Sequence, residues 1–135
     1  MQIQIKMGEI LLGYLDTELA KTDPPMGCGE APFHPSSHYP IVEELFRQQS
    51  EYTGFIGVRN EAGLNAINEK ISALNLLLAA ANGEVINVSG FAILDFRIEL
   101  PDEPLTFQFF GMHHEQFERL FPGHFAAYES SFANA

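Results

Sequence analysis

Leu76-Leu77-Leu78-Ala79-Ala80-Ala81-Asn82-Gly83-Glu84-Val85-Ile86-Asn87-Val88 is the stretch that decides the fold of this chain. Residues 76–81 are compatible with two structures, a helix that ends at a cap on Asn82-Gly83 or a strand that turns there. Asn-Gly followed by β-branched residues is a strong hairpin signal, and residues 85–88 need a strand partner close by. We favour the hairpin, and the helical alternative for residues 76–81 stays open.

The segments before this stretch contain two strands and two helices. Residues 2–7 alternate apolar and polar side chains, which predicts a strand, and residues 10–15 predict a second strand after a turn or bulge. One helix is predicted between Pro40 and Gly54, because proline is tolerated at the first helical position. Another is predicted over residues 62–73 from apolar residues at helical spacing.

Residues 22–40 form the most unusual segment, because they contain five prolines and two glycines: Pro24, Pro25, Pro32, Pro35, Pro40, Gly27 and Gly29. Proline lacks an amide hydrogen and disrupts helix interiors and central strands. The composition therefore predicts a long loop with neither helix nor central strand. Such a loop is either functional or held in place by its own apolar side chains.

The segments after the hairpin predict two more strands and a helical C-terminus. The strands are residues 91–100 and 105–110, joined by a proline-flanked turn. Beyond them the apolar residues follow helical spacing, with a break at Pro122-Gly123. A stripe of aromatic residues lies after that break: Phe125, Tyr128 and Phe132.

Together these segments predict a single α+β domain over residues 1–135. We expect a mainly antiparallel sheet of about four to six strands with two or more helices packed on one face. A chain of this length buries one core, and its 12 phenylalanines supply much of the apolar volume.

The chain is strongly acidic, with 18 Asp and Glu against 7 Lys and Arg and a formal net charge of -11. Its 46% of hydrophobic residues is nevertheless typical of a folded protein. The charge argues against nucleic acid and anionic membranes as partners, because both bind through basic patches. Basic proteins and cationic ligands remain compatible with it. The acidic residues are spread along the chain, so a concentrated acidic face arises only through folding.

Three features of the sequence bear on the compartment. The single cysteine, Cys28, cannot form an internal disulfide. No signal-peptide pattern is present at the N-terminus, and no apolar run approaches the roughly 20 residues of a membrane span. We therefore expect a cytoplasmic, bacterial-type protein with no membrane partner.

His114 and Glu118 are the candidate metal ligands. On a helix they lie one turn apart, where an imidazole and a carboxylate could share a zinc ion, and His34 or His38 could supply a third ligand. The pattern lacks the second histidine of the zinc-protease motif. We favour surface residues at the start of a helix, and we predict no metal or other cofactor.

Cys28, His34 and His38 are the candidate catalytic residues. Glycines on both sides expose the Cys28 thiol, and a nearby histidine could lower its pKa and make it a nucleophile. The spacing assigns no orienting acid and no oxyanion donor. An unreactive loop cysteine is therefore the favoured interpretation.

Two sets of closely spaced carboxylates are a further candidate, Asp95 with Glu99 around Arg97, and Asp16 with Glu18. On a strand such residues share a face, where one could serve as a general acid. We favour the solvated face of a half-buried sheet for both sets.

The C-terminal aromatic stripe has two interpretations of similar weight. Its rings either cover the core of their own domain or dock on a second copy of the chain. The second interpretation predicts a homodimer through the C-terminal segment, since two-fold dimers are the commonest soluble assembly.

Four stretches carry a resemblance to known proteins: Gly29-Glu30-Ala31-Pro32-Phe33, Asn82-Gly83-Glu84-Val85-Ile86, Ile93-Leu94-Asp95-Phe96 and residues 105–111. In these stretches the chain resembles small uncharacterised bacterial proteins, some of which are encoded on mobile integron gene cassettes. The shared residues look structural and bring no catalytic residue with them. The resemblance therefore implies a fold and a genomic setting rather than a reaction.

The favoured interpretation of the function is a non-catalytic acidic protein that binds a basic partner, in the manner of an immunity protein or an antitoxin. It depends on the acidic charge and on the fact that no catalytic set can be recognised from the spacing of residues in the sequence. The alternative is a small enzyme or small-molecule-binding protein with a Phe-lined pocket near the 22–40 loop.

Overall fold

The N-terminal hairpin forms the centre of the first of two sheets. The computed structural model describes residues 1–133, and in it β1 (Gln2–Met7) pairs with β2 (Ile10–Asp16) on one side and with β6 (Leu77–Ala80) on the other. β5 (His34–Pro35) extends the sheet beyond β2, and β7 (Val85–Ile86) extends it beyond β6. All pairs in this five-stranded sheet are antiparallel, as the alternation in β1 and the hairpin signal predict.

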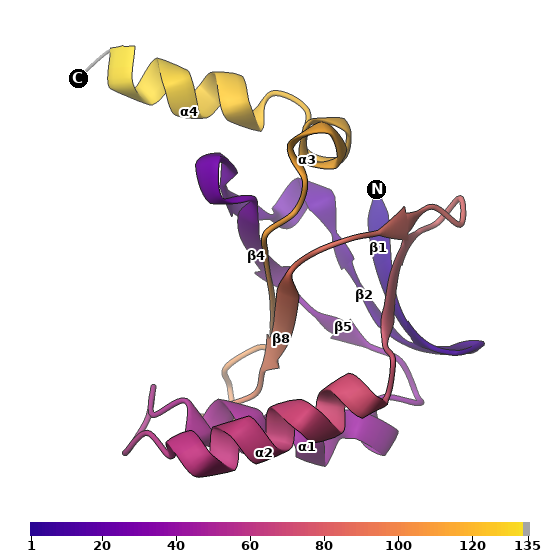
Figure 1. The fold of residues 1–135 in the computed structure, drawn as a ribbon, viewed down its shortest axis with the longest axis vertical. Helices are drawn as coiled ribbons and strands as arrows, with labels where there is room; N and C mark the ends of the chain where they lie inside the picture. The colour runs from indigo at the N-terminus through magenta and orange to yellow at the C-terminus, as the bar shows by residue number, and fades with distance from the viewer. Residues whose placement is uncertain (134–135) are drawn as a thin grey trace.

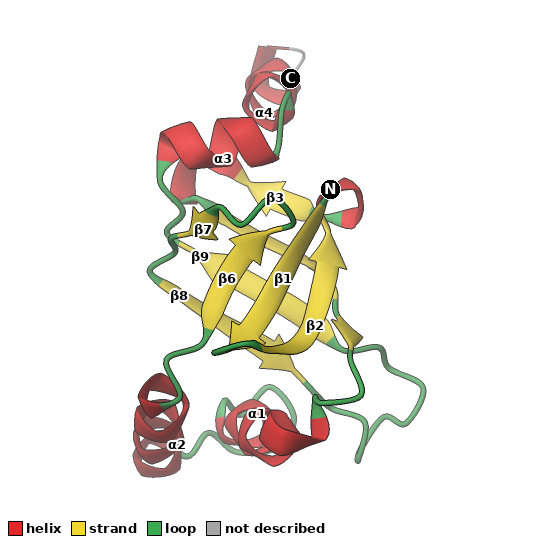
Figure 2. Ribbon diagram, turned by 90° about the vertical axis from the view of Figure 1, so that its right-hand side faces the viewer, coloured by secondary structure: helices red, strands yellow, loops and turns green. Residues whose placement is uncertain are grey.

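The second sheet has four strands in the order β3 (Lys21–Asp23), β4 (Cys28–Pro32), β9 (Thr106–Phe110) and β8 (Gly90–Leu94). Its pairs are antiparallel as well. The two sheets lie face to face in the middle of the molecule (Figure 2). The chain passes from one sheet to the other after β2, after β4 and after β7.

Helices close both ends of the paired sheets (Figure 1, Figure 2). α1 (Pro40–Tyr52) and α2 (Glu61–Ala73) pack together at one end, and α3 (His114–Leu120) and α4 (His124–Ala133) lie at the opposite end. The predicted α+β class with antiparallel strands is confirmed. The structure adds that the strands divide into two sheets and that the helices occupy two ends.

The core fills the space between the two sheets and is closed by helices. The first sheet contributes Ile3, Ile5, Leu12 and Leu15, and the second contributes Ala31, Ile93, Phe107 and Phe109. Val42 and Phe46 of α1 close one end, and Phe117, Leu120 and Phe121 close the other. Each fully buried large side chain stabilises the fold by about 1.5–3 kcal/mol through removal of apolar surface from water.

The hairpin at Asn82-Gly83 is confirmed. Leu78 lies opposite Ile86 in the register of β6 and β7. Gly83 has φ 90°, a left-handed conformation that glycine adopts without steric cost. The side-chain oxygen of Asn82 accepts a hydrogen bond from the backbone N–H of Glu84 at 3.0 Å. Residues 77–80 are therefore a strand, and the helical alternative for this stretch is wrong.

The prediction that residues 22–40 lack a central strand is also wrong. β4 lies between β3 and β9, and so it is an interior strand. The prolines permit this because of where they fall. Pro24 and Pro25 form a 3-10 turn between β3 and β4, and Pro32 is the last residue of β4. No proline occupies the middle of the ladder, where its missing N–H would be needed.

Tyr39, which precedes α1, has a hydroxyl group that is buried near the α1 end of the core. It is 2% exposed, and its ring lies 5.3 Å from that of Phe33. Its hydroxyl has no hydrogen-bond partner within residues 1–133. Burial, and then the negative charge of Asp95, raises the pKa of Tyr39 above its ordinary range.

We expect Tyr39→Phe to raise the free energy of unfolding by about 1 kcal/mol, because it removes a buried hydroxyl that forms no hydrogen bond. Urea denaturation at pH 7 measures the change. Tyr14→Phe is the control, since Tyr14 is only half-buried, and we expect it to change stability by less than about 0.5 kcal/mol. A loss of about 1 kcal/mol in Tyr39→Phe would instead show that the hydroxyl is bonded.

Candidate binding pocket

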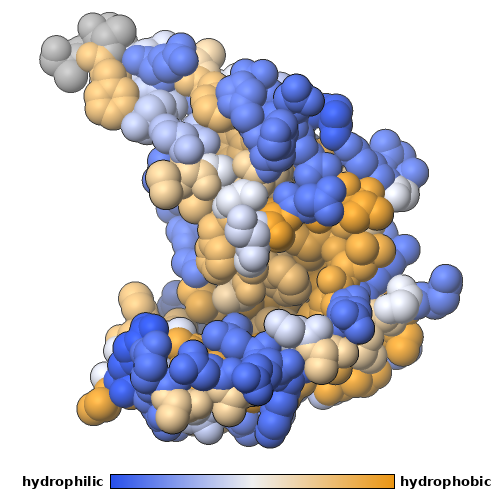
Figure 3. Space-filling view, viewed as in Figure 1, coloured by the Kyte–Doolittle hydropathy of each residue, from blue (hydrophilic) through white to orange (hydrophobic). Residues whose placement is uncertain are grey.

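A hollow lies between the edge strands of the two sheets. β7 and β8 are the last strands of their sheets, and the pocket opens between them, with α2 along the other side. Its volume is about 690 Å³. Figure 3 shows apolar surface gathered in the hollowed middle of this face, between the two helical ends of the molecule.

One side of the pocket is a face of α2. Leu64, Asn68, Ile71 and Ser72 line it at helical spacing. The helix begins at Glu61, after the N-cap residue Asn60, whose side chain accepts a hydrogen bond from the backbone N–H of Gly63. The four lining residues give the helix an uncharged face toward the cavity.

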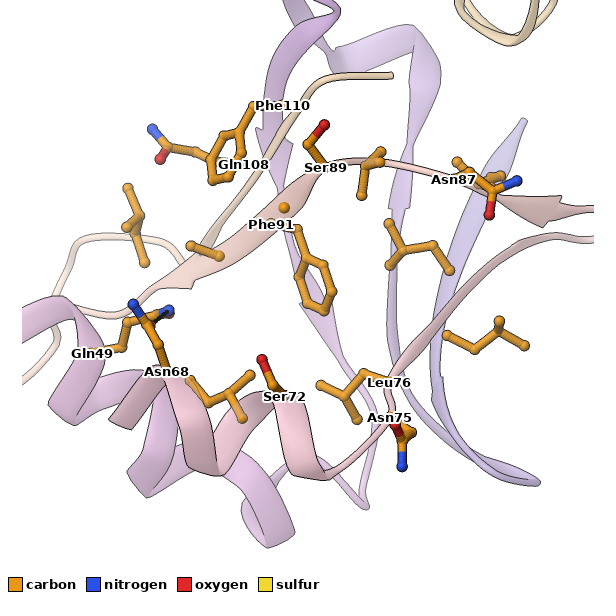
Figure 4. A pocket seen from close by; sticks show the side chains of 18 of the residues that line it. Gln49, Asn68, Ser72, Asn75, Leu76, Asn87, Ser89, Phe91, Gln108 and Phe110 are labelled. Atoms are coloured by element: carbon orange, nitrogen blue, oxygen red, sulfur yellow. Dashed lines mark hydrogen bonds between the residues drawn. The ribbon is translucent and has the colours of Figure 1, made fainter. Parts of the chain in front are cut away.

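The end of α2 and its neighbour α1 complete this side. Asn75 has φ 52° and ends the helix in a left-handed conformation that asparagine tolerates. Gln49 of α1 donates a hydrogen bond from Nε2 to Oδ1 of Asn68 at 2.8 Å. This bond joins two side chains of the pocket from different helices (Figure 4).

The opposite side comes from the chain between β7 and β8 and from the end of β9. Phe91 of β8 extends toward the helical side, with Ser89 and Phe110 above it in Figure 4. The ring of Phe91 stacks on that of the buried Phe107, with centroids 5.4 Å apart, so its position is fixed by the core. An aromatic surface is thereby presented at a defined place in the cavity.

Gln116 of α3 holds the segment that enters the pocket from β7. Its Nε2 donates to the carbonyl oxygen of Val85 at 3.0 Å, and its Oε1 accepts from the backbone N–H of Asn87 at 2.9 Å. Both of these bonded residues line the cavity. Gln116 therefore positions this side of the pocket from outside it.

The lining carries no charge. Although 19% of the residues in the chain are charged, none of the residues around this cavity is Asp, Glu, Lys, Arg or His. The polar groups are amides and hydroxyls, from Gln49, Asn68, Asn75, Asn87, Gln108, Thr53, Ser72 and Ser89. Amides both donate and accept hydrogen bonds, so the cavity can satisfy either kind of group on a ligand.

A second, shallower hollow of about 320 Å³ lies beside Cys28. Thr22, Asp23 and Glu30 are among its lining residues, and neither His34 nor His38 is. The Cys28 thiol donates a weak hydrogen bond to the carbonyl oxygen of Met26 at 3.4 Å. The structure therefore does not join Cys28 to either histidine in one cavity.

The two histidines lie in other surroundings. His34 is in β5 of the first sheet, where its ring stacks on Tyr14 at 4.9 Å and its Nε2 lies 4.0 Å from the carboxylate of Asp16. His38 is exposed in the turn before α1. Asp16 and its predicted partner Glu18 are both accessible to solvent.

His114 and Glu118 lie together on α3, as predicted, with Nε2 and Oε2 separated by 3.7 Å. Both side chains are mostly exposed, and the ring of His114 packs on Phe125 at 4.5 Å. Within residues 1–133 no group of three or more His, Cys, Asp or Glu side chains could hold a metal ion. The predicted third ligand, His34 or His38, is therefore not brought to this pair.

The prediction that Asp95 lies on a solvated strand face is wrong. β8 ends at Leu94, and Asp95 is only 2% exposed. Arg97 donates from Nε and from Nη2 to the two carboxylate oxygens of Asp95, each at 2.9 Å, and it also bonds to Glu43 of α1. Asp95 is therefore the buried partner of an ion pair with the partly exposed Arg97, whereas Glu99 is exposed.

Two opposed effects set the pKa of Asp95. Burial raises it, but the hydrogen bonds from the side chain and backbone N–H of Arg97, together with the charges of Arg97 and Arg47, outweigh burial and hold the pKa of Asp95 below its ordinary value. The backbone N–H of Asp95 donates to Ser50 Oγ at 2.9 Å. These bonds tie the end of β8 to α1.

Sequence reasoning missed the pocket, although one signal for it was present. Asn68 and Ser72 lie one turn apart on α2, and Asn75 follows just after its end, so that three uncharged polar residues at helical spacing in the sequence lie beside the apolar face of the helix. The residues opposite them come from the β7–β8 segment and the end of β9. These segments face α2 only because β7 and β8 are the last strands of their sheets. Periodicity within one element does not carry that information.

Comparison with known proteins supplies no relative. No protein-family model, no curated protein and no solved structure matches this chain. The resemblance to cassette-encoded bacterial proteins therefore stays a prediction. Among residues 1–133, no helix combines the length and the apolar character that crossing a bilayer requires.

Proposed function

We propose that this protein binds a small uncharged molecule in the pocket between α2 and the β7–β8 segment. The observation that carries the proposal is a cavity of about 690 Å³ without a charged lining residue in a chain of net charge -11. The volume falls within the range of about 300–1,000 Å³ that is typical of small-molecule sites.

The lining supports a neutral ligand with both polar and apolar parts. An ionic ligand finds no counter-charge in this lining. Taking an unpaired charge out of water costs far more free energy than doing so with a hydrogen-bonded amide or hydroxyl, so a neutral ligand is favoured. Five amide side chains supply donors and acceptors. Phe91 offers a fixed ring on which a flat or apolar face can pack.

The lining also supports binding rather than a reaction. Its hydroxyls belong to Thr53, Ser72 and Ser89, and no histidine or carboxylate lines the cavity to activate them. The remaining polar groups are amides, which bind and orient but do not transfer protons at neutral pH.

Pairs of compounds that differ in charge test this proposal. Adenosine and adenosine monophosphate form one pair, and N-acetylglucosamine and the cationic glucosamine form another, alongside a library of neutral fragments. We expect neutral compounds to shift the backbone amide NMR signals of pocket residues such as Asn68, Ser89 and Phe91. The charged member of a pair is expected to bind at least about tenfold more weakly, because the lining offers no counter-charge.

Ser72→Phe is the matched variant, because it places a ring in the pocket from an exposed helical position. We expect it to abolish the shifts, whereas Ala73→Phe, one residue along the same helix but outside the pocket, preserves them. Equal binding by charged and neutral compounds, or no neutral compound binding at this cavity, would overturn the proposal.

A further inference from the structure

Two loops at the α1 end of the molecule expose large apolar side chains. The first loop, residues 53–60, joins α1 to α2 and presents Phe55 and Val58, which are 80% and 89% exposed. The second loop, residues 95–104, joins β8 to β9 and presents Ile98 and Leu100, also exposed. We call these four side chains and their two loops the two-loop surface.

The two loops are held next to each other. The ring of Phe55 stacks on that of Phe96 with centroids 5.3 Å apart, and Phe96 belongs to the second loop. The backbone N–H of Leu100 donates to the carbonyl oxygen of Phe96 at 2.7 Å, which closes a turn around Ile98. The four exposed apolar side chains therefore lie on one connected structure.

Local anchors fix both loops to the body of the protein. The first loop is closed by a hydrogen bond from the N–H of Asn60 to the carbonyl of Tyr52 at 3.0 Å. In the second, the ion pair of Arg97 with the buried Asp95 holds the loop base against α1. Because Arg97 is drawn inward, its neighbour Ile98 is left facing solvent.

The unpaired charge around these side chains is negative. Glu51, Glu99, Asp102 and Glu103 lie in or beside the two loops, are exposed, and form no ion pair within residues 1–133. The two arginines of the region are already paired, Arg59 with Glu61, and Arg97 with Asp95 and Glu43. Exposed apolar groups with an unneutralised acidic rim are typical of an interaction surface.

We propose that the two-loop surface docks a basic protein segment that carries apolar side chains between its positive charges. Lysine or arginine side chains would meet the acidic rim while apolar ones pack on Phe55 and Ile98. A second copy of this chain would bring the same acidic rim and be repelled, and nucleic acid would be repelled by its phosphates. None of the four apolar residues lines the pocket, so the two sites use different side chains, although Thr53 at the start of the first loop borders the pocket.

Synthetic peptides of defined composition test the proposal. The probes are a short alternating Lys-Leu peptide, a Lys-Ser peptide of equal charge, and a Glu-Leu peptide of equal apolar content. We expect the Lys-Leu peptide to bind at least about tenfold more tightly than either other peptide, as titration calorimetry measures. Its affinity is expected to fall when the salt concentration is raised, because salt screens charge pairs at the rim.

Matched variants locate the binding. Phe55→Ser combined with Ile98→Ser is expected to weaken binding of the Lys-Leu peptide at least about tenfold. Leu19→Ser combined with Met26→Ser is the control, because it removes two exposed apolar side chains outside the two-loop surface. Equal weakening in both pairs, or no preference for the Lys-Leu peptide, overturns the proposal. Ser72→Phe is expected to leave peptide binding unchanged, which separates this result from that of the pocket.

Discussion

Arg97→Met is expected to lower the free energy of unfolding by about 3 kcal/mol at pH 7, because it leaves the buried carboxylate of Asp95 without its counter-ion. Breaking a buried ion pair by removing one partner costs about 3–5 kcal/mol in general. We expect the lower end of that range, since a third of the Arg97 side chain is exposed and water can take over part of its interaction with the carboxylate. Urea denaturation monitored by circular dichroism measures the loss.

The loss is expected to shrink as the pH falls. In the native protein the pKa of Asp95 is held below its ordinary value, so the ion pair contributes stability above the unfolded pKa of about 4. That contribution is lost as the pH falls through the lower folded value. In Arg97→Met, burial without the arginine raises the pKa of Asp95, and the carboxyl becomes neutral at a pH where the native one is still charged.

Arg59→Met is the matched control. It removes an arginine paired with Glu61 on the surface, where both partners are mostly exposed, and we expect no measurable change in the free energy of unfolding. Asp95→Asn combined with Arg97→Met is expected to recover part of the loss, since neither charge then remains unpaired. Equal costs for the Arg97 and Arg59 variants would contradict the buried ion pair.

Gly27→Ala is expected to lower the free energy of unfolding by about 3 kcal/mol, for two reasons. The added Cβ clashes with backbone atoms, and the backbone conformation at this position is unfavourable for any residue with a side chain. Gly27 has φ 63°, in the left-handed region, where a non-glycine residue costs about 1–2 kcal/mol. An added Cβ would lie 2.7 Å from the backbone nitrogen of Met112 and closer still to its carbonyl oxygen.

The close approach of Gly27 to the backbone of Met112 allows a hydrogen bond between the two residues. The N–H of Met112 donates to the carbonyl oxygen of Gly27 at 3.0 Å, which joins the β3–β4 turn to the chain that leads from β9 into α3. The Met112 side chain is buried in the core, so it cannot move away without opening a cavity. A backbone clash here is therefore relieved only by breaking a hydrogen bond or disturbing the packing.

Gly8→Ala isolates the conformational part of this cost. Gly8 has φ 61°, nearly the same as Gly27, but an added Cβ would meet no atom within 4 Å. We expect this variant to lose only about 1–2 kcal/mol in the same urea experiment. A loss in Gly27→Ala that does not exceed that in Gly8→Ala would contradict the close contact with Met112.

The strands and helices with strong local signals were predictable. The alternation in β1, the turn at Asn82-Gly83 and the proline at the start of α1 are set by backbone sterics and by local burial, so they are visible in a few consecutive residues. The break at Pro122-Gly123 between α3 and α4 belongs to the same class.

The interior strand β4 was not predictable from composition. A count of prolines between residues 22 and 40 suggests a loop, but the effect of a proline depends on whether its position needs a ladder N–H. That requirement is set by the neighbouring strand β9, more than 70 residues away in the chain. Asp95 was misjudged for the same reason, because α1 covers the end of β8.

The sequence by itself determined the α+β class, the principal hairpins and helices and the acidic charge, because propensity, periodicity and composition are local or additive properties. Only the tertiary structure decided that the strands form two sheets, that Asp95 is buried with Arg97, and that an uncharged pocket opens between β7 and β8. It also brought Phe55 and Phe96 together on the two-loop surface. Each of these depends on contacts between residues far apart in the chain, and such contacts are selected by the burial of the whole core rather than by any single segment.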